Sequence, residues 1–146
     1  MIGLIQRVRM AHVDVAGETV GRIGPGLLAL VAVQPHDGEA QAQRMLERLL
    51  GYRVFADADG KMNRSLADTR GGLLLVSQFT LAADTSKGMR PSFASAATPE
   101  AGRKWFERLV EIAKMRHSPV EIGRFGAHME VGLVNDGPVT FWLEAR

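Results

Sequence analysis

The chain has 146 residues, of which 46% are hydrophobic and 23% are charged, and it contains no cysteine. This composition is typical of a globular protein, the length predicts a single domain over residues 1–146, and the lack of cysteine excludes disulfides, thiolate nucleophiles and cysteine-ligated metal sites. The 18 basic and 16 acidic residues give a net charge of +2, which permits a nucleic-acid partner without arguing for one.

The sequence predicts neither a signal peptide nor a membrane span. Gln6 and Arg7 interrupt the first apolar residues before a signal-peptide core can form, and no apolar run approaches the ~20 residues of a membrane helix. We therefore expect a cytoplasmic protein with no membrane partner.

The first third of the chain predicts a hairpin, a buried strand and a helix. Apolar and polar residues alternate over 12–23 around a turn at Gly17-Glu18, and the continuous apolar run Leu27–Val33 is typical of a strand buried on both faces. From Asp37 the period becomes helical, and Gly51 stands where a C-terminal cap is expected. The apolar face of this helix consists of Ala42, Met45, Leu46, Leu49 and Leu50.

The middle of the chain predicts two further strands and a long loop. Tyr52–Phe55 reads as a short strand that ends in a turn at Asp57–Gly60. Leu73–Leu81 is the second long apolar strand, interrupted only by polar residues near its end. Residues 82–97 form a loop of a length that is more often functional than not.

The last third predicts a second helix and two strands. Thr98 caps the helix, Pro99 occupies its first position, and Pro119 ends it, with Trp105, Phe106, Leu109, Ile112 and Ala113 facing inward. Alternating residues then lead to a tight turn at Asn135–Pro138 and a final strand over Val139–Leu143.

This order of elements predicts a mixed α/β fold. Either two packed β-sheets or a barrel-like mixed sheet would accommodate it, with the two main helices on one side. No glycine-rich loop follows the first strand, which argues against a dinucleotide-binding domain.

The polar residues Ser77, Gln78 and Thr80, with Phe79 between them, are unusual at the end of an aliphatic strand. Buried without partners, each polar group would cost about 1–3 kcal/mol, so each must bond to backbone, water or a ligand. The strand either emerges into solvent here or forms the floor of a pocket.

A second unusual segment is Asn135–Thr140, whose residues are those of an ordinary turn. A cis bond between Gly137 and Pro138 would direct two successive carbonyl oxygens the same way, as a rigid acceptor pair for an amine.

The loop between these segments contributes Lys87, Arg90 and Phe93. Such cations can meet phosphate oxygens and the ring can pack on a base, although a solvated loop has the same composition. The basic residues of the second helix alternate with glutamates, which favours a salt-bridged solvent face.

No standard catalytic template is present. Ser77 lacks a G-x-S-x-G motif, and the four histidines (His12, His36, His117 and His128) show no metal-ligand spacing. We expect neither a metal nor a cofactor.

Taken together, these segments resemble the D-aminoacyl-tRNA deacylases, also called the D-tyrosyl-tRNA deacylase family, over essentially the whole chain. The paired Ser-Gln-Phe-Thr and Gly-Pro-Val-Thr motifs are the most specific part of the resemblance. The matching segments are Leu4–Val8, Gly60–Asn63, Val76–Leu81, Lys87–Phe93, Phe125–Ala127 and Asn135–Thr140.

The resemblance implies hydrolysis of the ester bond of D-aminoacyl-tRNA and of mischarged glycyl-tRNA(Ala), as chirality proofreading in translation. It implies a homodimer with active sites at the subunit interface, the aminoacylated 3′ end of tRNA as partner, and no DNA partner. Gly137 and Pro138, joined by a cis bond, would enter the partner's site, capture the substrate's amino group and exclude L-residues by a steric clash. Arg7 would hold this segment in place.

The resemblance also implies roles for the other motif residues. Ser77, Gln78, Phe79 and Thr80 would form the catalytic pocket for the terminal adenosine and the ester carbonyl, with backbone N–H groups near Phe79 and Thr80 as an oxyanion site. The remaining substrate-binding residues would be Val139, Thr140, Lys87, Arg90, Pro91, Ser92 and Phe93.

Two mechanisms remain open at this point. Thr80 could act as a nucleophile, for which the sequence offers no nearby base, or the 2′-hydroxyl of the terminal adenosine could activate a water molecule in a site that supplies positioning and oxyanion stabilisation. We favour the second. Two alternative functions are a non-hydrolytic binding module, associated with RNA ends or chromatin, and a hydrolase of small D-amino acid esters that needs no RNA.

Overall fold

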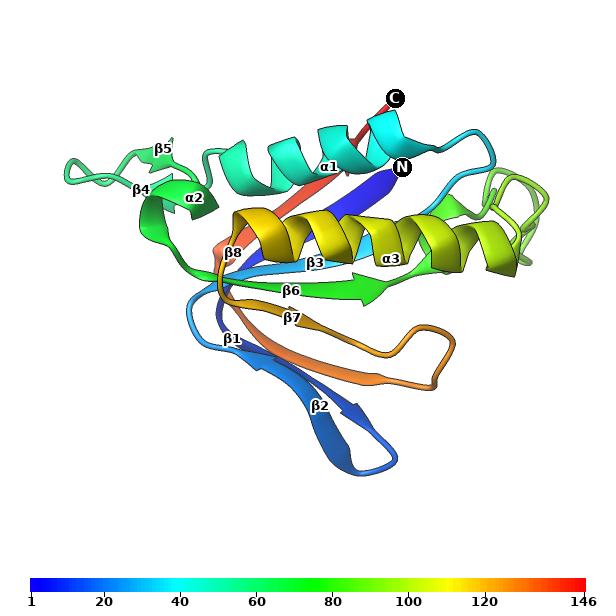
Figure 1. Cartoon of the computed structure of the whole chain (residues 1–146), viewed down its shortest axis with the longest axis horizontal. Coiled ribbons are helices and arrows are strands. Elements are labelled where there is room, and N and C mark those ends of the chain that lie inside the picture. The colour runs from blue at the N-terminus through cyan, green and yellow to red at the C-terminus, as the bar shows by residue number, and fades with distance from the viewer.

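The computed structural model describes residues 1–146, and its two long helices lie side by side on one face of a strongly curved sheet (Figure 1). None of the helices combines the length and the apolar character needed to cross a membrane. In chain order the elements are β1 (Ile2–Val15), β2 (Glu18–Ile23), β3 (Gly26–Ala32), α1 (Glu39–Gly51), β4 (Phe55–Ala56), β5 (Met62–Arg64), α2 (Leu66–Thr69), β6 (Gly72–Ser77), the 3₁₀ helix η1 (Phe79–Ala82), α3 (Pro99–Arg116), β7 (Val120–Ile122) and β8 (Glu130–Glu144).

The strand β1 organises the main sheet. Its first half pairs antiparallel with β3, its second half pairs antiparallel with β2, and β8 follows its other edge over almost the whole length. The strands β3, β6 and β7 are parallel to one another, so their carboxyl ends meet at one edge. The small sheet β4–β5 lies apart.

The main sheet curls until β2 approaches β7. A Cβ atom on Gly21 of β2 would lie 2.6 Å from the carbonyl oxygen of Ile122 of β7, a distance that only glycine permits. The sheet is therefore nearly closed, which confirms the predicted mixed α/β class and selects the barrel-like alternative over two packed sheets. Both helices lie on one side, as the sequence predicts (Figure 1).

Two apolar clusters fill the two faces of this sheet. The larger one joins the inner faces of α1 and α3 to one face of the sheet, and all five apolar residues predicted for the first helix are buried in it. On α3, Trp105 is only partly buried, while Phe106, Leu109, Ile112 and Ala113 are buried. The second cluster fills the inside of the curl. Burial of each large side chain stabilises the fold by about 1.5–3 kcal/mol.

The helix boundaries agree with the sequence except at one position. Thr98 caps α3, where its hydroxyl accepts a hydrogen bond from the backbone N–H of Ala101 at 3.2 Å. Gly51, however, is the last residue of α1 rather than its cap, and the capping residue Tyr52 has an extended backbone. The predicted strand Tyr52–Phe55 is displaced for the same reason, because the chain pairs with β5 only at Phe55 and Ala56.

Two predicted strand boundaries are wrong. The second long strand ends at Ser77, because the chain turns there into η1 instead of continuing to Leu81. The predicted turn at Asn135–Pro138 is a bulge within the single strand β8. Gln6 of β1 pairs with Thr140 of β8, and Val8, two residues further along β1, pairs with Asn135, five residues back along β8. The extra residues of β8 between these pairs therefore project out of the ladder.

One charged contact joins the two long helices and makes stability depend on pH. Arg108 of α3 donates hydrogen bonds from Nε and Nη2 to the carboxylate of Glu39 on α1. These bonds, with a smaller contribution from Gln43, lower the pKa of Glu39 from 4.5 to about 2. The contact therefore stabilises the fold above about pH 4.5 and is lost as the pH falls towards about 2.

We predict that Glu39→Gln flattens the fall in the free energy of unfolding between about pH 4.5 and 2, because the titrating carboxylate is gone. Chemical denaturation across this range measures the slope. Glu100→Gln, which removes an exposed carboxylate of α3 that forms no ion pair, serves as the control and should keep the wild-type slope. Equal slopes for the two variants would contradict the prediction.

Candidate active site

A pocket of about 420 Å³ opens where the parallel strands β3, β6 and β7 end. Ser77, Gln78 and Phe79 form one wall, and the first turns of α3 and the loop after β7 form the others. Ten of the 17 residues around the pocket are hydrophobic. Ser77, Gln78 and Phe79 therefore lie at a pocket, whereas the next residue, Thr80, is exposed and is not among the residues around it.

The Ser77–Thr80 segment changes direction at Gln78. Ser77 still pairs with Val31 of β3, and the backbone N–H of Gln78 donates to the carbonyl of Val31 at 2.7 Å. The next two backbone N–H groups, those of Phe79 and Thr80, open the 3₁₀ helix and have no acceptor within the chain. Two adjacent donors are thus left free beside the pocket, as an oxyanion site requires.

The side chains of this segment are held from within it. Gln78 Nε2 donates a short hydrogen bond to Thr80 Oγ1. Phe79 is 61% exposed and packs against Phe93, with ring centroids 5.2 Å apart. No ionisable side chain bonds the Thr80 hydroxyl.

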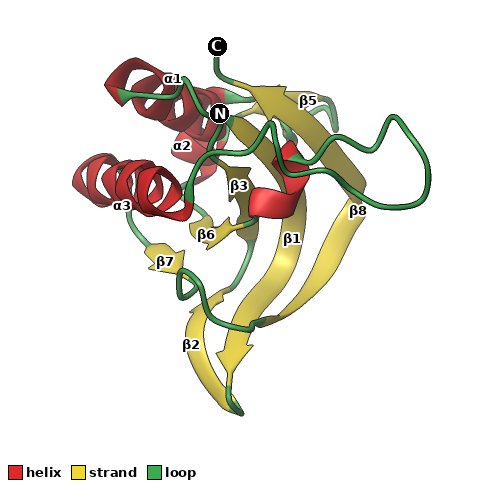
Figure 2. Cartoon of the chain, turned by 90° about the vertical axis from the view of Figure 1, so that its right-hand side faces the viewer, coloured by secondary structure: helices red, strands yellow, loops and turns green.

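The loop that follows η1 extends away from the sheet (Figure 2). Asp84 and Ser92 close it at its base through two backbone hydrogen bonds of 2.8 and 3.0 Å. Hydrogen bonds from Ser86 hold the pKa of the Asp84 carboxyl below its ordinary value. Of the predicted loop residues, Ser92 thus belongs to this base and Phe93 lies against Phe79, whereas Lys87, Arg90 and Pro91 lie in the exposed part that the two hydrogen bonds enclose.

The second motif lies on the bulge of β8, where the Gly137–Pro138 peptide bond is cis. Arg7 of β1 holds this bulge with a two-pronged contact: Nε donates to the carbonyl of Asp136 at 3.0 Å, and Nη1 donates to the carbonyl of Val54 at 2.7 Å. Asn135 Nδ2 donates to the carbonyls of Arg7 and Val139 at 2.9 and 3.0 Å. The bulge is therefore fixed although Gly137 and Pro138 are exposed.

Glycine is required at position 137. Its φ of +141° lies in a region that side chains rarely adopt, and a Cβ there would lie 2.6 Å from Val139 Cγ2. Of the two remaining motif residues, Val139 packs against the larger apolar cluster and Thr140 returns to the ladder opposite Gln6. Gly137, Pro138 and Thr140 are exposed, so the motif presents the glycine backbone, the proline ring and the threonine to the solvent.

The two motifs do not meet within one chain. Gly137 lies on β8 beside Arg7, whereas Ser77 lies on β6, level with Gly3 of β1. Three strand spacings of about 4.8 Å and four residues of about 3.3 Å separate them, or roughly 20 Å along the sheet. A site that uses both motifs therefore needs a second source for one of them.

Comparison with known proteins gives a full-length match. Residues 4–144 match the family model described as D-Tyr-tRNA(Tyr) deacylase. The chain belongs to this family. The D-aminoacyl-tRNA deacylase of Stenotrophomonas maltophilia strain K279a is 69% identical, with 98% of this chain and 99% of the relative covered, and that of Alkalilimnicola ehrlichii is 66% identical, with 100% and 97% covered.

Solved structures share the fold of this deacylase-family chain. One named "c-Myc DNA Unwinding Element Binding Protein" has a TM-score of 0.95 at 36% identity and covers 100% of this chain and 99% of its own. Another, described as a probable eukaryotic D-amino acid tRNA deacylase, has a TM-score of 0.83 at 18% identity with 98% of each chain covered, which supports the fold alone.

Two of the pocket walls were not assigned to the site from the sequence, although Phe125–Ala127 is one of the segments that resemble the family. Thr98 and Gly102 of α3 form one wall, and Phe125, His128 and Met129, from the loop after β7, form the other. His128 is the only ionisable residue around the pocket, and no group of three or more potential metal ligands exists in the structure. The available signal was topological, because loops that follow neighbouring parallel strands meet at one edge of the sheet.

We predict that Arg7→Lys loosens the Gly137–Pro138 bulge, because a single ammonium group cannot span the two carbonyls that the guanidinium joins. Amide hydrogen exchange of a peptide over residues 130–142 should become faster. A peptide over β6 is the internal control and should keep its exchange rate. Unchanged exchange in the first peptide would show that Asn135 alone holds the bulge.

Proposed function

We propose that the chain hydrolyses the ester bond of D-aminoacyl-tRNA, releasing the D-amino acid and free tRNA. The observation that carries this proposal is the pocket beside Phe79 and Thr80, with its two free backbone N–H groups, in a chain that matches deacylases from end to end. Release of glycine from mischarged glycyl-tRNA(Ala) is part of the same proposal, because glycine has no side chain to exclude. The reaction takes place in the cytoplasm, where aminoacyl-tRNA is consumed.

The pocket suits the 3′-terminal adenosine of tRNA. Its walls include the aromatic rings of Phe79, Phe106 and Phe125, and Phe93 packs on the first of them. Bases stack on such rings, and Ser77 and Gln78 supply hydrogen-bonding groups at the pocket edge. In this pose the ester carbonyl lies near the free N–H groups of the η1 segment.

A second copy of the chain completes the site. The roughly 20 Å between the two motifs along the sheet is too far for one substrate ester to touch both. An exposed Gly137–Pro138 bulge on a firmly held strand is suited to entering a partner's pocket. Phe79, Phe141 and Trp142 are exposed apolar residues of the kind that a homodimer interface buries.

Chiral selection follows from the backbone of this bulge. The carbonyl oxygens around the Gly137–Pro138 bond accept hydrogen bonds from the substrate's amino group. An L-residue held by the same amine directs its side chain into the bulge, while a D-residue directs it away and glycine has none. Discrimination therefore rests on a steric clash, which a rigid backbone delivers better than a flexible side chain.

Hydrolysis by substrate assistance fits the surroundings of Thr80. Its hydroxyl oxygen already accepts a hydrogen bond from Gln78, and no ionisable group bonds to it, so a nucleophilic threonine has no base. The 2′-hydroxyl of the terminal adenosine is instead positioned to activate water, and the free N–H groups stabilise the oxyanion. The chain needs no metal or cofactor in this mechanism.

We predict fast hydrolysis of D-Tyr-tRNA and Gly-tRNA(Ala) and little hydrolysis of L-Tyr-tRNA, as measured by the release of labelled amino acid. A 2′-deoxy terminal adenosine should slow release by orders of magnitude, whereas Thr80→Ala should retain most activity. The reverse pattern would establish Thr80 as the nucleophile.

Faster hydrolysis of a free D-tyrosine ester than of the tRNA ester would favour the small-ester hydrolase. Binding of tRNA without release of the amino acid would favour the binding module. The name of the solved c-Myc DNA unwinding element binding protein also describes a binding function.

We predict that two inactive variants restore each other's activity when mixed. Gly137→Ala obstructs the bulge and Phe79→Ala weakens the adenosine pocket, so each pure dimer has two damaged sites. After subunit exchange, half of the dimers hold one intact site, which gives about a quarter of the wild-type activity. No recovery on mixing, with subunit exchange verified by native mass spectrometry, would place both motifs of each site in one chain.

A further inference from the structure

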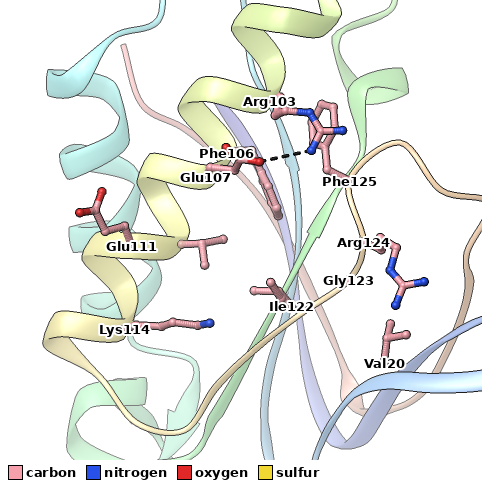
Figure 3. A pocket seen from close by; sticks show the side chains of 11 residues that line it. Val20, Arg103, Phe106, Glu107, Glu111, Lys114, Ile122, Gly123, Arg124 and Phe125 are labelled. Carbon is pink, nitrogen blue, oxygen red and sulfur yellow. Dashed lines mark hydrogen bonds and ion pairs between the residues drawn. The ribbon is translucent and has the colours of Figure 1, made fainter.

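A second hollow, of about 520 Å³, lies beside the active-site pocket between α3 and the segment around β7 (Figure 3). Its floor is apolar and includes Phe106, Val110 and Ile122. Lys114 enters it from α3, and Arg124 lies on the opposite wall. The proposed deacylation does not use this groove.

The groove carries free positive charge. Its two carboxylates are already paired: Glu107 with Arg103 at 3.3 Å, and Glu111 with Arg108 at 2.8 Å. Lys114 and Arg124 are exposed and form no ion pair. Two unpaired cations over an apolar floor attract a polyanion, not a neutral or a cationic partner.

The groove adjoins the active-site pocket. Phe106 and Phe125 belong to the walls of both hollows, and along α3 Gly102 faces the pocket while the next residue, Arg103, faces the groove. The Arg103 guanidinium lies over the Phe125 ring, 4.7 Å from its centre, and the ring also packs on Phe106, so a cation stands at the border between the two hollows. An arginine plane beside a basic groove is a surface on which nucleic-acid bases can stack.

We propose that this groove binds the phosphodiester backbone of the tRNA strand that leads away from the terminal adenosine. The proposal rests on the proposed function, which places that adenosine in the neighbouring pocket. The groove extends along α3 from Arg103 to Lys114, 11 residues or about 16 Å along the helix axis, which is long enough for more than one nucleotide of a strand. Lys114 and Arg124 are the phosphate contacts, and Arg103, stacked on Phe125, lies between the two hollows.

Affinity for deacylated tRNA, measured by fluorescence anisotropy at several salt concentrations, tests this proposal without any need for catalysis. Lys114→Ala and Arg124→Ala should each weaken binding about two- to fivefold, and the double variant about tenfold, with a shallower dependence of log Kd on log salt. Lys114→Arg should bind like the wild type. Arg44→Ala, which removes an exposed cation of α1, is the matched control and should not change the affinity.

Kinetics link the groove to the active site. The double variant should raise KM for D-Tyr-tRNA with little change in kcat, and should leave kcat/KM for D-tyrosyl-adenosine unchanged, because that substrate has no strand to place in the groove. Equal tRNA affinity in the double variant and Arg44→Ala overturns the groove proposal while the deacylase proposal stands. A wild-type protein that hydrolyses neither ester overturns the deacylase proposal, and the affinity series still decides whether the groove binds RNA.

Discussion

The pairing of β8 along nearly the whole of β1 is the constraint on which the rest of the structure depends. Because β1 is shared between β3 and β2 on one edge, its other edge needs a single long partner, and β8 provides it. The same pairing fixes where the extra residues of β8 must leave the ladder. The exposed Gly137–Pro138 bulge is thus a product of strand register, anchored on both sides by regular sheet.

The helices could be predicted from the sequence because their signals are local. The apolar period of α1 and the Thr98 and Pro99 start of α3 act within a few residues of each element. The ends of β6 and the path of β8 could not be predicted in this way. A segment of Asn, Asp, Gly and Pro is typical both of a turn and of a bulge. Only its register against β1, some 130 residues away, decides which of the two forms.

The candidate site could likewise be predicted only where its signal is local in the sequence. Ser77 and Gln78 stood out because polar groups are costly in an aliphatic strand, and they do lie at a pocket. The walls from α3 and from the loop at Phe125–Met129 could not be assigned to the site, although Phe125–Ala127 matched the family, because each gains its role only when three parallel strands end together. The separation of the two motifs within one chain is likewise a property of strand order.

The contacts of Arg7 determine which neighbouring positions tolerate substitution. Both of its strong hydrogen bonds go to main-chain carbonyls, those of Val54 and Asp136, and every amino acid offers such a carbonyl. Substitutions at positions 54 and 136 therefore keep both acceptors, and a change at position 136 removes only the longer contact, of 3.5 Å, between Arg7 Nε and Asp136 Oδ2. Asn135 shares this role through its own bonds to the carbonyls of Arg7 and Val139, so the shape of the bulge depends on two side chains, Arg7 and Asn135, more than on the residues whose carbonyls they hold.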